Sequence, residues 1–404
     1  MYKVGIIGAG VGGSYLAYRL SKEGVDTIVF DFRAPHEKIC GGGVTYKAIE
    51  RFPIISELPI DRKEIWKSTL ISPKEEAVTV DLEKPLTLLS RMDLDYSLLT
   101  IAQEAGTHFT KEKVISFARE GNCWKIFTVN GDYTVEFLVG ADGALSRTRK
   151  KLGVVKRKED AFFALECFLK LKRDEVIFKF FPDIQGYLWA FPRSNNLAVG
   201  IVSNHCGRMN VKIIEERLRN FIKRHYPEQT QKISLKGAYI PPFCADNSES
   251  MRICDNNWAL IGDAATFVDP VSGEGIYYAM YSAEILSQCI VKNELARYQP
   301  LCMKHFGENL AKALQSIKYV YQPEFIEVMI QMAKESLSVR NIIADMMSGS
   351  LNYVNWKGAL RKELYAIMSD FIFNADLASK HEVIANLFKL SSKHYKPFLG
   401  NKIS

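Results

Sequence analysis

The sequence predicts a mixed α/β (α+β) fold, and three observations support this class. An apolar segment at residues 3–7 runs directly into a glycine-rich turn, which a helical pattern and a second apolar segment follow. Residues 161–202 instead alternate in strand fashion, with Pro-Asp and Asn-Asn turn signals between the segments. From about residue 275 onward, apolar residues recur mostly at helical spacing. We therefore expect a Rossmann-like nucleotide-binding domain, an inserted antiparallel-sheet domain and a C-terminal helical region.

The first segment has the pattern of a dinucleotide-binding unit. Gly8, Gly10 and Gly13 stand in the spacing Gly-x-Gly-x-x-Gly, between the strand at residues 3–7 and a helix predicted at residues 14–23. Gly8 permits the tight turn, Gly10 lets the backbone approach a pyrophosphate, and Gly13 lets helix and strand pack closely. The pyrophosphate would lie on the N-terminus of the helix, where free N–H groups and the helix dipole favour an anion.

The second predicted strand, Thr27–Phe30, completes this unit. It ends at Asp31, whose carboxylate is placed to accept hydrogen bonds from ribose hydroxyls. Gly12 belongs to the same loop, and we assign it to cofactor binding with the other three glycines. The alternative is a glycine turn used only for packing, and two later motifs count against it.

The following residues are expected to alternate between sheet and helix. Residues 94–104 have apolar positions at helical spacing. Strands are predicted at residues 68–72, 77–82, 86–89, 113–117, 124–129 and 133–139.

A second cofactor signal follows the last of these strands. The apolar residues 137–141 end at Asp142 and Gly143, and a polar helix start with the pattern Ser-x-x-Arg comes next. An Asp-Gly pair alone usually marks an ordinary turn. The apolar strand before it and the arginine after it favour a cofactor contact by Asp142.

A third signal lies far along the chain, after a helix predicted at Val211–His225. An apolar run at residues 258–261 ends at Gly262 and Asp263, and a Pro- and Gly-rich turn then feeds a helix that begins at residues 273–276. Asp263 can accept hydrogen bonds from a ribityl chain, although a helix N-cap is the alternative for this residue. Gly262, the turn glycines Gly273 and Gly275, and Ile276 at the helix start are assigned to cofactor binding together with Asp263.

Together, the three signals indicate one long cofactor that spans the fold, and FAD fits this requirement best. The positive end of the third helix would face the flavin pyrimidine and stabilise the anionic reduced ring by roughly 0.3–2 kcal/mol. The expected domains are a discontinuous FAD-binding domain at 1–60, 90–158 and 255–300, a sheet-rich substrate domain at 61–89 and 159–254, and a C-terminal helical region at 301–404.

Composition limits the function classes. The chain has 404 residues, 47% hydrophobic and 25% charged, with a net charge of +7, and its Lys and Arg are spread rather than clustered. Nucleic acid is therefore not an expected partner, whereas phosphate-bearing cofactors and an anionic membrane surface are compatible with this charge. The eight Cys form no C-x-x-C pair, so we expect no metal site. No signal peptide and no long apolar run are visible, and a cytoplasmic protein with reduced thiols is the expectation.

The three cofactor signals, in this order, resemble the superfamily of FAD-dependent reductases and monooxygenases that includes the aromatic hydroxylases. Arg91 matches the superfamily's arginine that opens a helix beside the FAD phosphates. The alternative for Arg91 is a surface residue near a helix start.

Two further segments resemble the geranylgeranyl reductase family, and the resemblance covers roughly residues 1–300. Residues 38–43, Lys-Ile-Cys-Gly-Gly-Gly, are similar to its Lys-x-Cys-Gly-Gly segment. Residues 186–193 are similar to its Tyr-x-Trp-x-Phe-Pro-Lys segment, with Arg193 in the place of the usual Lys. The resemblance implies reduction of isoprenoid double bonds, in which reduced flavin gives a hydride and a proton reaches the other alkene carbon.

The resemblance also implies site residues. Tyr187, Trp189 and Phe191 alternate, so they share one sheet face and are expected to line a prenyl tunnel. A stripe of core aromatics is the alternative. Cys40 and Gly41 lie in the loop where substrate would meet the flavin, and both are assigned to cofactor binding. Cys40, Tyr187 and Trp189 are the expected catalytic residues. A small buried residue is the alternative for Cys40.

Three other functions remain open at this point. A flavin monooxygenase or halogenase would use oxygen on an aromatic ring, and a carotenoid-type cyclase would be redox-neutral. An escort protein for prenylated GTPases would bind isoprenoids without flavin, but the intact Gly262-Asp263 pair argues against it. The electron donor also stays open between NADPH and a ferredoxin.

The C-terminal region matches no motif. Its last residues combine lysines with aromatics, which are Phe388, Lys389, Lys393, Tyr395, Lys396, Phe398 and Lys402. A basic, aromatic helix and tail of this kind favour peripheral contact with a membrane that holds a lipid substrate. A solvated helical cap is the alternative.

Overall fold

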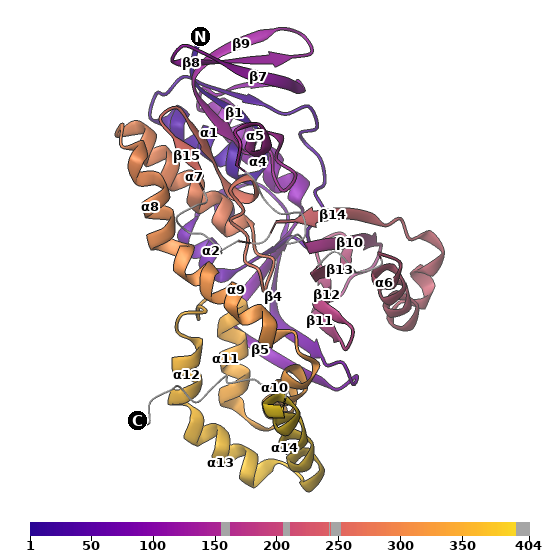
Figure 1. The fold of residues 1–404 in the computed structure, drawn as a ribbon. Helices are drawn as coiled ribbons and strands as arrows, with labels where there is room; N and C mark the ends of the chain where they lie inside the picture. The colour runs from indigo at the N-terminus through magenta and orange to yellow at the C-terminus, as the bar shows by residue number, and fades with distance from the viewer. Residues whose placement is uncertain (155–161, 205–210, 242, 244–251, 393–404) are drawn as a thin grey trace, which may run out of the picture.

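The computed structural model describes residues 1–154, 162–204, 211–241, 243 and 252–392. Within these residues, two eight-stranded sheets are followed by a layer of C-terminal helices. Figure 1 shows the strands β7–β9 at one end of the molecule and the helices α12–α14 at the other, with the long strands β4 and β5 between them. The mixed α/β class predicted from the sequence is confirmed.

The first sheet has a parallel centre of Rossmann type. Its order is β15-β16-β9-β1-β2-β6, and β9 also pairs antiparallel with the hairpin β7-β8. The strands β1 and β2 are almost wholly buried, which explains their continuous apolar sequences. The bounds are Tyr2–Ile7 (β1), Thr27–Phe30 (β2), His108–Thr110 (β6), Val114–Glu120 (β7), Cys123–Thr128 (β8), Asp132–Gly140 (β9), Cys254–Asp255 (β15) and Trp258–Leu260 (β16).

Helices α1 and α7 pack together against this sheet, and its buried side chains form the largest core of the molecule. The helices that accompany the sheet are Val11–Lys22 (α1), Tyr46–Arg51 (α2), Ile54–Glu57 (α3), Arg91–Glu104 (α4), Arg147–Lys151 (α5) and Ile276–Val291 (α7). The helix expected at residues 14–23 thus begins three residues earlier, directly after the glycine turn.

The second sheet is mostly antiparallel, with the order β14-β10-β13-β12-β11-β4-β5-β3. One of its faces packs against helix α6, Val211–His225, through an apolar core that includes Leu188 and Leu218. The opposite face turns toward the C-terminal helices. The strands are Gly43–Val44 (β3), Arg62–Ile71 (β4), Ala77–Leu89 (β5), Phe162–Leu169 (β10), Val176–Phe181 (β11), Ile184–Pro192 (β12), Leu197–Asn204 (β13) and Lys236–Ile240 (β14).

The structure corrects one sequence prediction in this sheet. The segments expected as separate strands at 77–82 and 86–89 form the single strand β5. Its register with β4 shifts between the pairs Ile65–Leu86 and Lys67–Asp81, and this irregularity spans Pro85. A bulge of this kind lets a proline stay inside a long strand, because the missing N–H is not required by the ladder there.

The C-terminal region is helical, as expected. Helix α11 packs against β5, and α10 packs against α14. No helix in the described part of the chain is both long and apolar enough to cross a membrane. The basic, aromatic tail that the sequence marks lies outside the described residues from residue 393 on. The helices are Tyr298–Cys302 (α8), Glu308–Val320 (α9), Pro323–Glu335 (α10), Leu337–Ser348 (α11), Trp356–Lys362 (α12), Leu364–Asn374 (α13) and Leu377–Ser392 (α14).

Candidate functional site

A single cavity of about 1440 Å³ runs from the glycine turn after β1 to the C-terminal helices. Pockets that hold one small molecule usually measure about 300–1000 Å³, so this cavity has room for a cofactor and a second molecule. Of the residues assigned from the sequence, only Gly13 is not in its wall. The others that line it are Gly8, Gly10, Gly12, Asp31, Cys40, Gly41, Arg91, Asp142, Tyr187, Trp189, Phe191, Gly262, Asp263, Gly273, Gly275 and Ile276.

The glycine turn has the geometry that its spacing predicts. Gly8 has a φ of 111°, and a Cβ added to it would lie 2.4 Å from the carbonyl oxygen of Ala141. A Cβ on Gly13 would lie 2.0 Å from the carbonyl oxygen of Gly8, so this glycine permits close packing of helix on turn. Around Gly10 the nearest atom to such a Cβ is Oδ2 of Asp95, at 3.8 Å, which leaves an open side toward the cavity.

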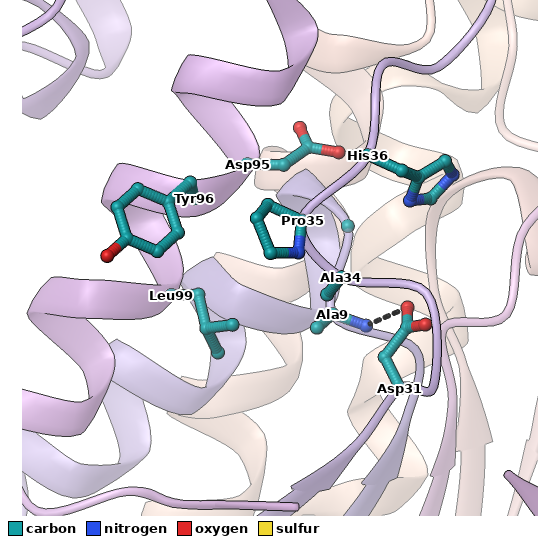
Figure 2. Close-up of a pocket in the computed structure, with 9 residues that line it drawn as sticks. Ala9, Asp31, Ala34, Pro35, His36, Asp95, Tyr96 and Leu99 are labelled. Carbon is teal, nitrogen blue, oxygen red and sulfur yellow. Dashed lines mark hydrogen bonds between the residues drawn. The ribbon is translucent and has the colours of Figure 1, made fainter. Parts of the chain in front are cut away.

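Asp31 lies beside this turn at the end of β2. Its Oδ2 accepts a hydrogen bond of 3.0 Å from the backbone N–H of Ala9, and its Oδ1 accepts one of 2.9 Å from Arg33. Figure 2 shows the carboxylate directed at the turn, across a small pocket from Asp95 and Tyr96 of helix α4. The carboxylate therefore fixes the turn in addition to facing the cavity.

Arg91 begins helix α4, and it is not a surface residue. Ser90 caps the helix by accepting a hydrogen bond from the N–H of Asp93. The Arg91 side chain is buried and makes two hydrogen bonds of 3.1 and 3.0 Å to the carboxylate of Asp95. Burial opposes the charge, but the Asp95 carboxylate outweighs it and raises the pKa of the guanidinium. Arg91 is therefore a permanently charged group in the cavity wall.

Asp142 and Asp263 lie on neighbouring segments that Arg149 joins. Asp142 accepts hydrogen bonds from the Ser146 hydroxyl and from the backbone N–H of Thr148, and it thereby fixes the start of α5. The Arg149 guanidinium donates to the carbonyl oxygens of Asp263 and Ala264 at 3.2 and 3.0 Å. The second and third cofactor signals are thus brought together.

The N-cap alternative for Asp263 is wrong. Helix α7 begins after Gly275, and the short helical turn at residues 262–265 begins after Ile261. The Asp263 carboxylate instead forms an ion pair of 2.8 Å with Lys38. A Cβ on Gly275 would lie 3.2 Å from Oδ1 of Asp263, so the carboxylate packs closely on the backbone that starts α7.

The aromatic stripe of β12 is both core and cavity wall. Tyr187, Trp189 and Phe191 pack in one apolar cluster and line the cavity together. The hydroxyl of Tyr187 donates to the carbonyl oxygen of Ser272, which ties the stripe to the turn before α7. A Cβ on Gly41 would lie 2.5 Å from the ring of Phe191, so the loop that contains Cys40 lies directly on this stripe.

Arg193, directly after β12, fixes the loop that precedes β3. Its buried guanidinium donates to the carbonyl oxygens of Gly41 and Cys40, at 3.2 and 2.5 Å, and forms an ion pair of 2.8 Å with Glu37. Glu37 also accepts a hydrogen bond from the Ser90 hydroxyl at the start of α4. Burial raises the pKa of Glu37, but Arg193 and the hydrogen bonds outweigh it and keep that pKa below its usual range.

Glu166 is a residue of this site that sequence reasoning missed. It is 1% exposed on β10, and its Oε2 accepts a hydrogen bond of 3.0 Å from the backbone N–H of Cys40. Burial raises the pKa of its carboxyl group to about 7, although Arg193 and the Cys40 N–H act in the opposite direction. The available signal was a lone Glu in the apolar segment Phe162–Leu169, since a buried carboxylate needs partners.

The far end of the cavity is formed by elements without any recognised motif. Lys47 forms an ion pair of 2.6 Å with Glu274 and lies over the rings of Tyr277 and Tyr278. Burial opposes the charge of Lys47, but Glu274 raises its pKa above the usual value. The C-terminal region contributes the remaining wall, which includes Asn309, Tyr321, Ile343, Met346, Met347 and Tyr353.

Comparisons with known proteins agree with this geometry. Residues 6–49 match the family model of an NAD(P)-binding Rossmann-like domain. An uncharacterized protein of Methanosarcina barkeri is 30% identical over 337 residues, which cover 79% of this chain and 82% of that protein. The geranylgeranyl diphosphate reductase of Synechocystis is 26% identical over 72% of this chain and 75% of its own length. The crystal structure of a geranylgeranyl bacteriochlorophyll reductase-like protein of Thermoplasma acidophilum superposes with a TM-score of 0.72 at 21% identity, covering 89% of this chain and 98% of that one.

Proposed function

Because the chain belongs to the geranylgeranyl reductase family of FAD-dependent oxidoreductases, we propose that it saturates C=C bonds in the geranylgeranyl or other isoprenoid chains of lipids or quinones. The observation that supports this most is the lining of the cavity, which contains both the glycine turn after β1 and the aromatic stripe of β12. The half of the cavity lined by the glycine turn, Asp31 and Asp263 is the cofactor half, and the half lined by Trp189, Phe191 and Met347 is the apolar half. The Cys40 loop also lines the cavity, and the aromatic stripe of β12 lies against this loop.

The glycine turn fits FAD, because Gly10 has an open side where the pyrophosphate would approach. Asp31 would bind the ribose, and Arg91 would lie beside the phosphates. Asp142 and Gly262 would contact the isoalloxazine end, and Asp263 would accept from the ribityl hydroxyls. Gly273, Gly275 and Ile276 would present the N-terminus of α7 to the pyrimidine. When bound and reduced, FAD supplies the hydride.

The apolar half suits a prenyl chain. Trp189 and Phe191 would contact the reacting isoprene unit, and Tyr187 would close the wall between it and the turn at residues 272–275. The tail would extend between the second sheet and helix α11, where Leu70 and Met347 both pack against one apolar cluster. Burial of each chain CH₂ contributes about 0.8 kcal/mol of binding.

The residues of this protein would orient the alkene, exclude water from it and donate a proton. An isolated alkene accepts hydride poorly, so orientation and exclusion of water are needed. Hydride addition to one alkene carbon leaves the other to take a proton, and we assign this proton to Cys40, whose Sγ lies 3.4 Å from the N–H of Gly42. Tyr187 and Trp189 hold the chain against that loop. Electrons would come from NADPH or from a ferredoxin.

We also propose that the C-terminal helices contact an anionic membrane. Helix α13 exposes apolar side chains along one face, with Tyr365 at 88% and Phe373 at 82% exposure. Exposed lysine and arginine side chains flank it, including Lys357 and Arg361 of α12. Large apolar residues beside basic ones favour a helix that lies in the interface of a lipid surface.

The deciding experiment is anaerobic turnover. Purified protein is reduced with dithionite and incubated with a polyprenyl lipid, and mass spectrometry should find a gain of two hydrogens for each bond. A product that forms only with oxygen would indicate a monooxygenase or halogenase, and a product of unchanged mass would indicate a cyclase. A colourless protein that takes up no flavin would favour the escort function.

A further inference from the structure

Glu166, Gly200 and Trp189 form one row across the second sheet. Glu166 of β10 pairs with Gly200 of β13, and Gly200 pairs with Trp189 of β12. Residues in one row of an antiparallel sheet share a face. A Cβ on Gly200 would lie 2.2 Å from Cζ2 of Trp189, so the indole ring lies across the place where a side chain would stand. Because Gly200 has no side chain, the Trp189 ring can lie over it, on the side of Glu166.

The two flanking side chains have polar atoms without a hydrogen-bond partner among the described residues. These atoms are Oε1 of Glu166 and Nε1 of Trp189, and both are buried. The carboxyl and the indole N–H are close enough to interact, yet they do not complete a hydrogen bond of ordinary geometry. A donor and an acceptor left open side by side are unusual in a folded core, where unmade hydrogen bonds are costly.

The other oxygen of Glu166 is engaged with the loop that meets the substrate. Oε2 accepts from the Cys40 N–H, and Arg193 holds the carbonyl oxygen of the same residue. Cys40 and Trp189 both line the cavity, whereas Glu166 stands behind them. Glu166 is therefore bonded to the Cys40 loop through Oε2, while its other oxygen, Oε1, stays open on the side of Trp189.

We propose that Glu166 is a positioning residue whose protonation state decides whether it holds both the Cys40 loop and the Trp189 indole or only one of them. This inference rests on the proposed function, in which those two residues face the reacting isoprene unit. A carboxylate accepts hydrogen bonds at both oxygens, whereas a protonated carboxyl turns one oxygen into a donor. Deprotonation therefore pulls the Trp189 N–H onto Oε1, and protonation releases it.

The groups around Glu166 allow both states near neutral pH. Burial, and to a smaller extent the nearby Glu37 carboxylate, favour the protonated form, while Arg193, the Cys40 N–H and the Trp189 indole favour the carboxylate. Lys236 is the register partner of Glu166 on β14 and adds a further positive group at that edge. The balance brings the pKa of this carboxyl to about 7, well above the range of an exposed Glu.

Tryptophan fluorescence of the purified flavoprotein tests the proposal without any turnover. The chain has five Trp, so the signal of Trp189 is the difference between wild type and Trp189→Phe. In the wild type we expect this difference in fluorescence to change with pH, with a midpoint near pH 7. In Glu166→Gln the corresponding difference, taken against the double variant Glu166→Gln, Trp189→Phe, should not change with pH. The matched control is Glu327→Gln, which alters another buried carboxyl with an open oxygen, away from the cavity. It should leave the titration unchanged.

The opposite result is equally clear. A difference signal that keeps its midpoint in Glu166→Gln would overturn the proposal. If that variant does not fold, Glu166→Asp replaces it, and its shorter side chain should shift the midpoint and reduce the amplitude; wild-type behaviour would again refute the idea. In turnover, Glu166→Gln should lose the pH dependence of kcat near 7 while its flavin content stays at the wild-type value. The fluorescence measurement needs no substrate. A protein that is inactive on prenyl chains would therefore refute the proposed function, and the fluorescence titration would still test the role of Glu166.

Discussion

The ammonium group of Lys38 lies 2.8 Å from Oδ2 of Asp263 in the wall of the cavity, although the two motifs are far apart in the sequence. The pair joins the loop that contains Cys40 to the segment assigned to the ribityl chain. The Asp263 carboxylate is therefore charge-paired within the cavity wall. The loop before β3 and the turn at residues 262–265 are therefore linked by an ion pair.

Replacing Asp263 with Ala should weaken flavin binding about 10- to 100-fold, because hydrogen bonds to a charged group contribute about 1.5–3 kcal/mol. Flavin absorbance after gel filtration and a titration of added FAD would measure this. The matched control is Asp174→Ala, which removes the fully exposed partner of a surface ion pair with Lys63. Equal flavin retention by both variants would refute the role given to Asp263.

Replacing Trp189 with Ala should reduce prenyl turnover at least ten-fold and leave flavin content close to that of the wild type. The reason is that the ring faces the apolar half of the cavity. Trp66→Ala is the control, because Trp66 is half exposed on β4. Parallel loss of flavin and turnover in Trp189→Ala would contradict the division of the cavity into two halves.

Replacing Arg193 with Ala should lower the free energy of unfolding by about 1.5–3 kcal/mol, because the carbonyl oxygens of Gly41 and Cys40 lose a charged donor and the partly buried Glu37 loses its ion-pair partner. Denaturant unfolding of the flavin-loaded protein would measure it. Arg217→Ala breaks an exposed ion pair with Asp183 and should cost at most about 1 kcal/mol. A loss as small as that of the control would show that the guanidinium does not fix the Cys40 loop.

The stability of the wild type should fall as the pH rises from 4.5 to about 7, through the contribution of Glu166. Its folded-state pKa of about 7 lies above the ordinary value of 4.5. The folded protein therefore binds this proton more tightly than the unfolded chain, so the stabilisation is complete below 4.5 and is lost above 7. The full difference is about 3 kcal/mol. Parallel stability curves for wild type and Glu166→Gln between pH 5 and 8 would contradict it.

The double variant Tyr365→Ser, Phe373→Ser should bind anionic phospholipid vesicles less tightly than the wild type in co-sedimentation, by about ten-fold or more. Both side chains are exposed on α13, and insertion of such residues drives interfacial binding. Val129→Ser removes an exposed apolar residue near the other end of the molecule and serves as the control. Unchanged binding by the double variant would place the lipid contact elsewhere or exclude it.

The elements that local sequence patterns determine were predicted well. The strand Thr27–Phe30 and the helix Val211–His225 have the expected bounds. The spacing of apolar residues that predicts each element lies within the element itself. The strand break expected before residue 86 was wrong, since the bulge that accommodates Pro85 depends on the register with β4. The register is a property of a pair of strands, so it cannot be predicted from the sequence of either strand alone.

The same limit applies to the site. The cofactor motifs lie in continuous segments, so their residues could be named from the sequence, and all but Gly13 line the cavity. Glu166, Gly200 and Glu37 act through neighbours on other strands and loops, and no spacing along the chain reveals those contacts. The wall formed by Met346 and Met347 was missed for a similar reason, because an apolar helix gives no sign of which sheet it covers.

Helix α11 closes the apolar end of the cavity, and it lies well outside every segment assigned to the flavin. Under the proposed function, changes at Ile343, Met346 or Met347 would lengthen or shorten the space for the prenyl chain without touching the residues assigned to the flavin. Under the proposed function, chain-length preference and redox chemistry would therefore be set by separate parts of the fold, and one could change without the other.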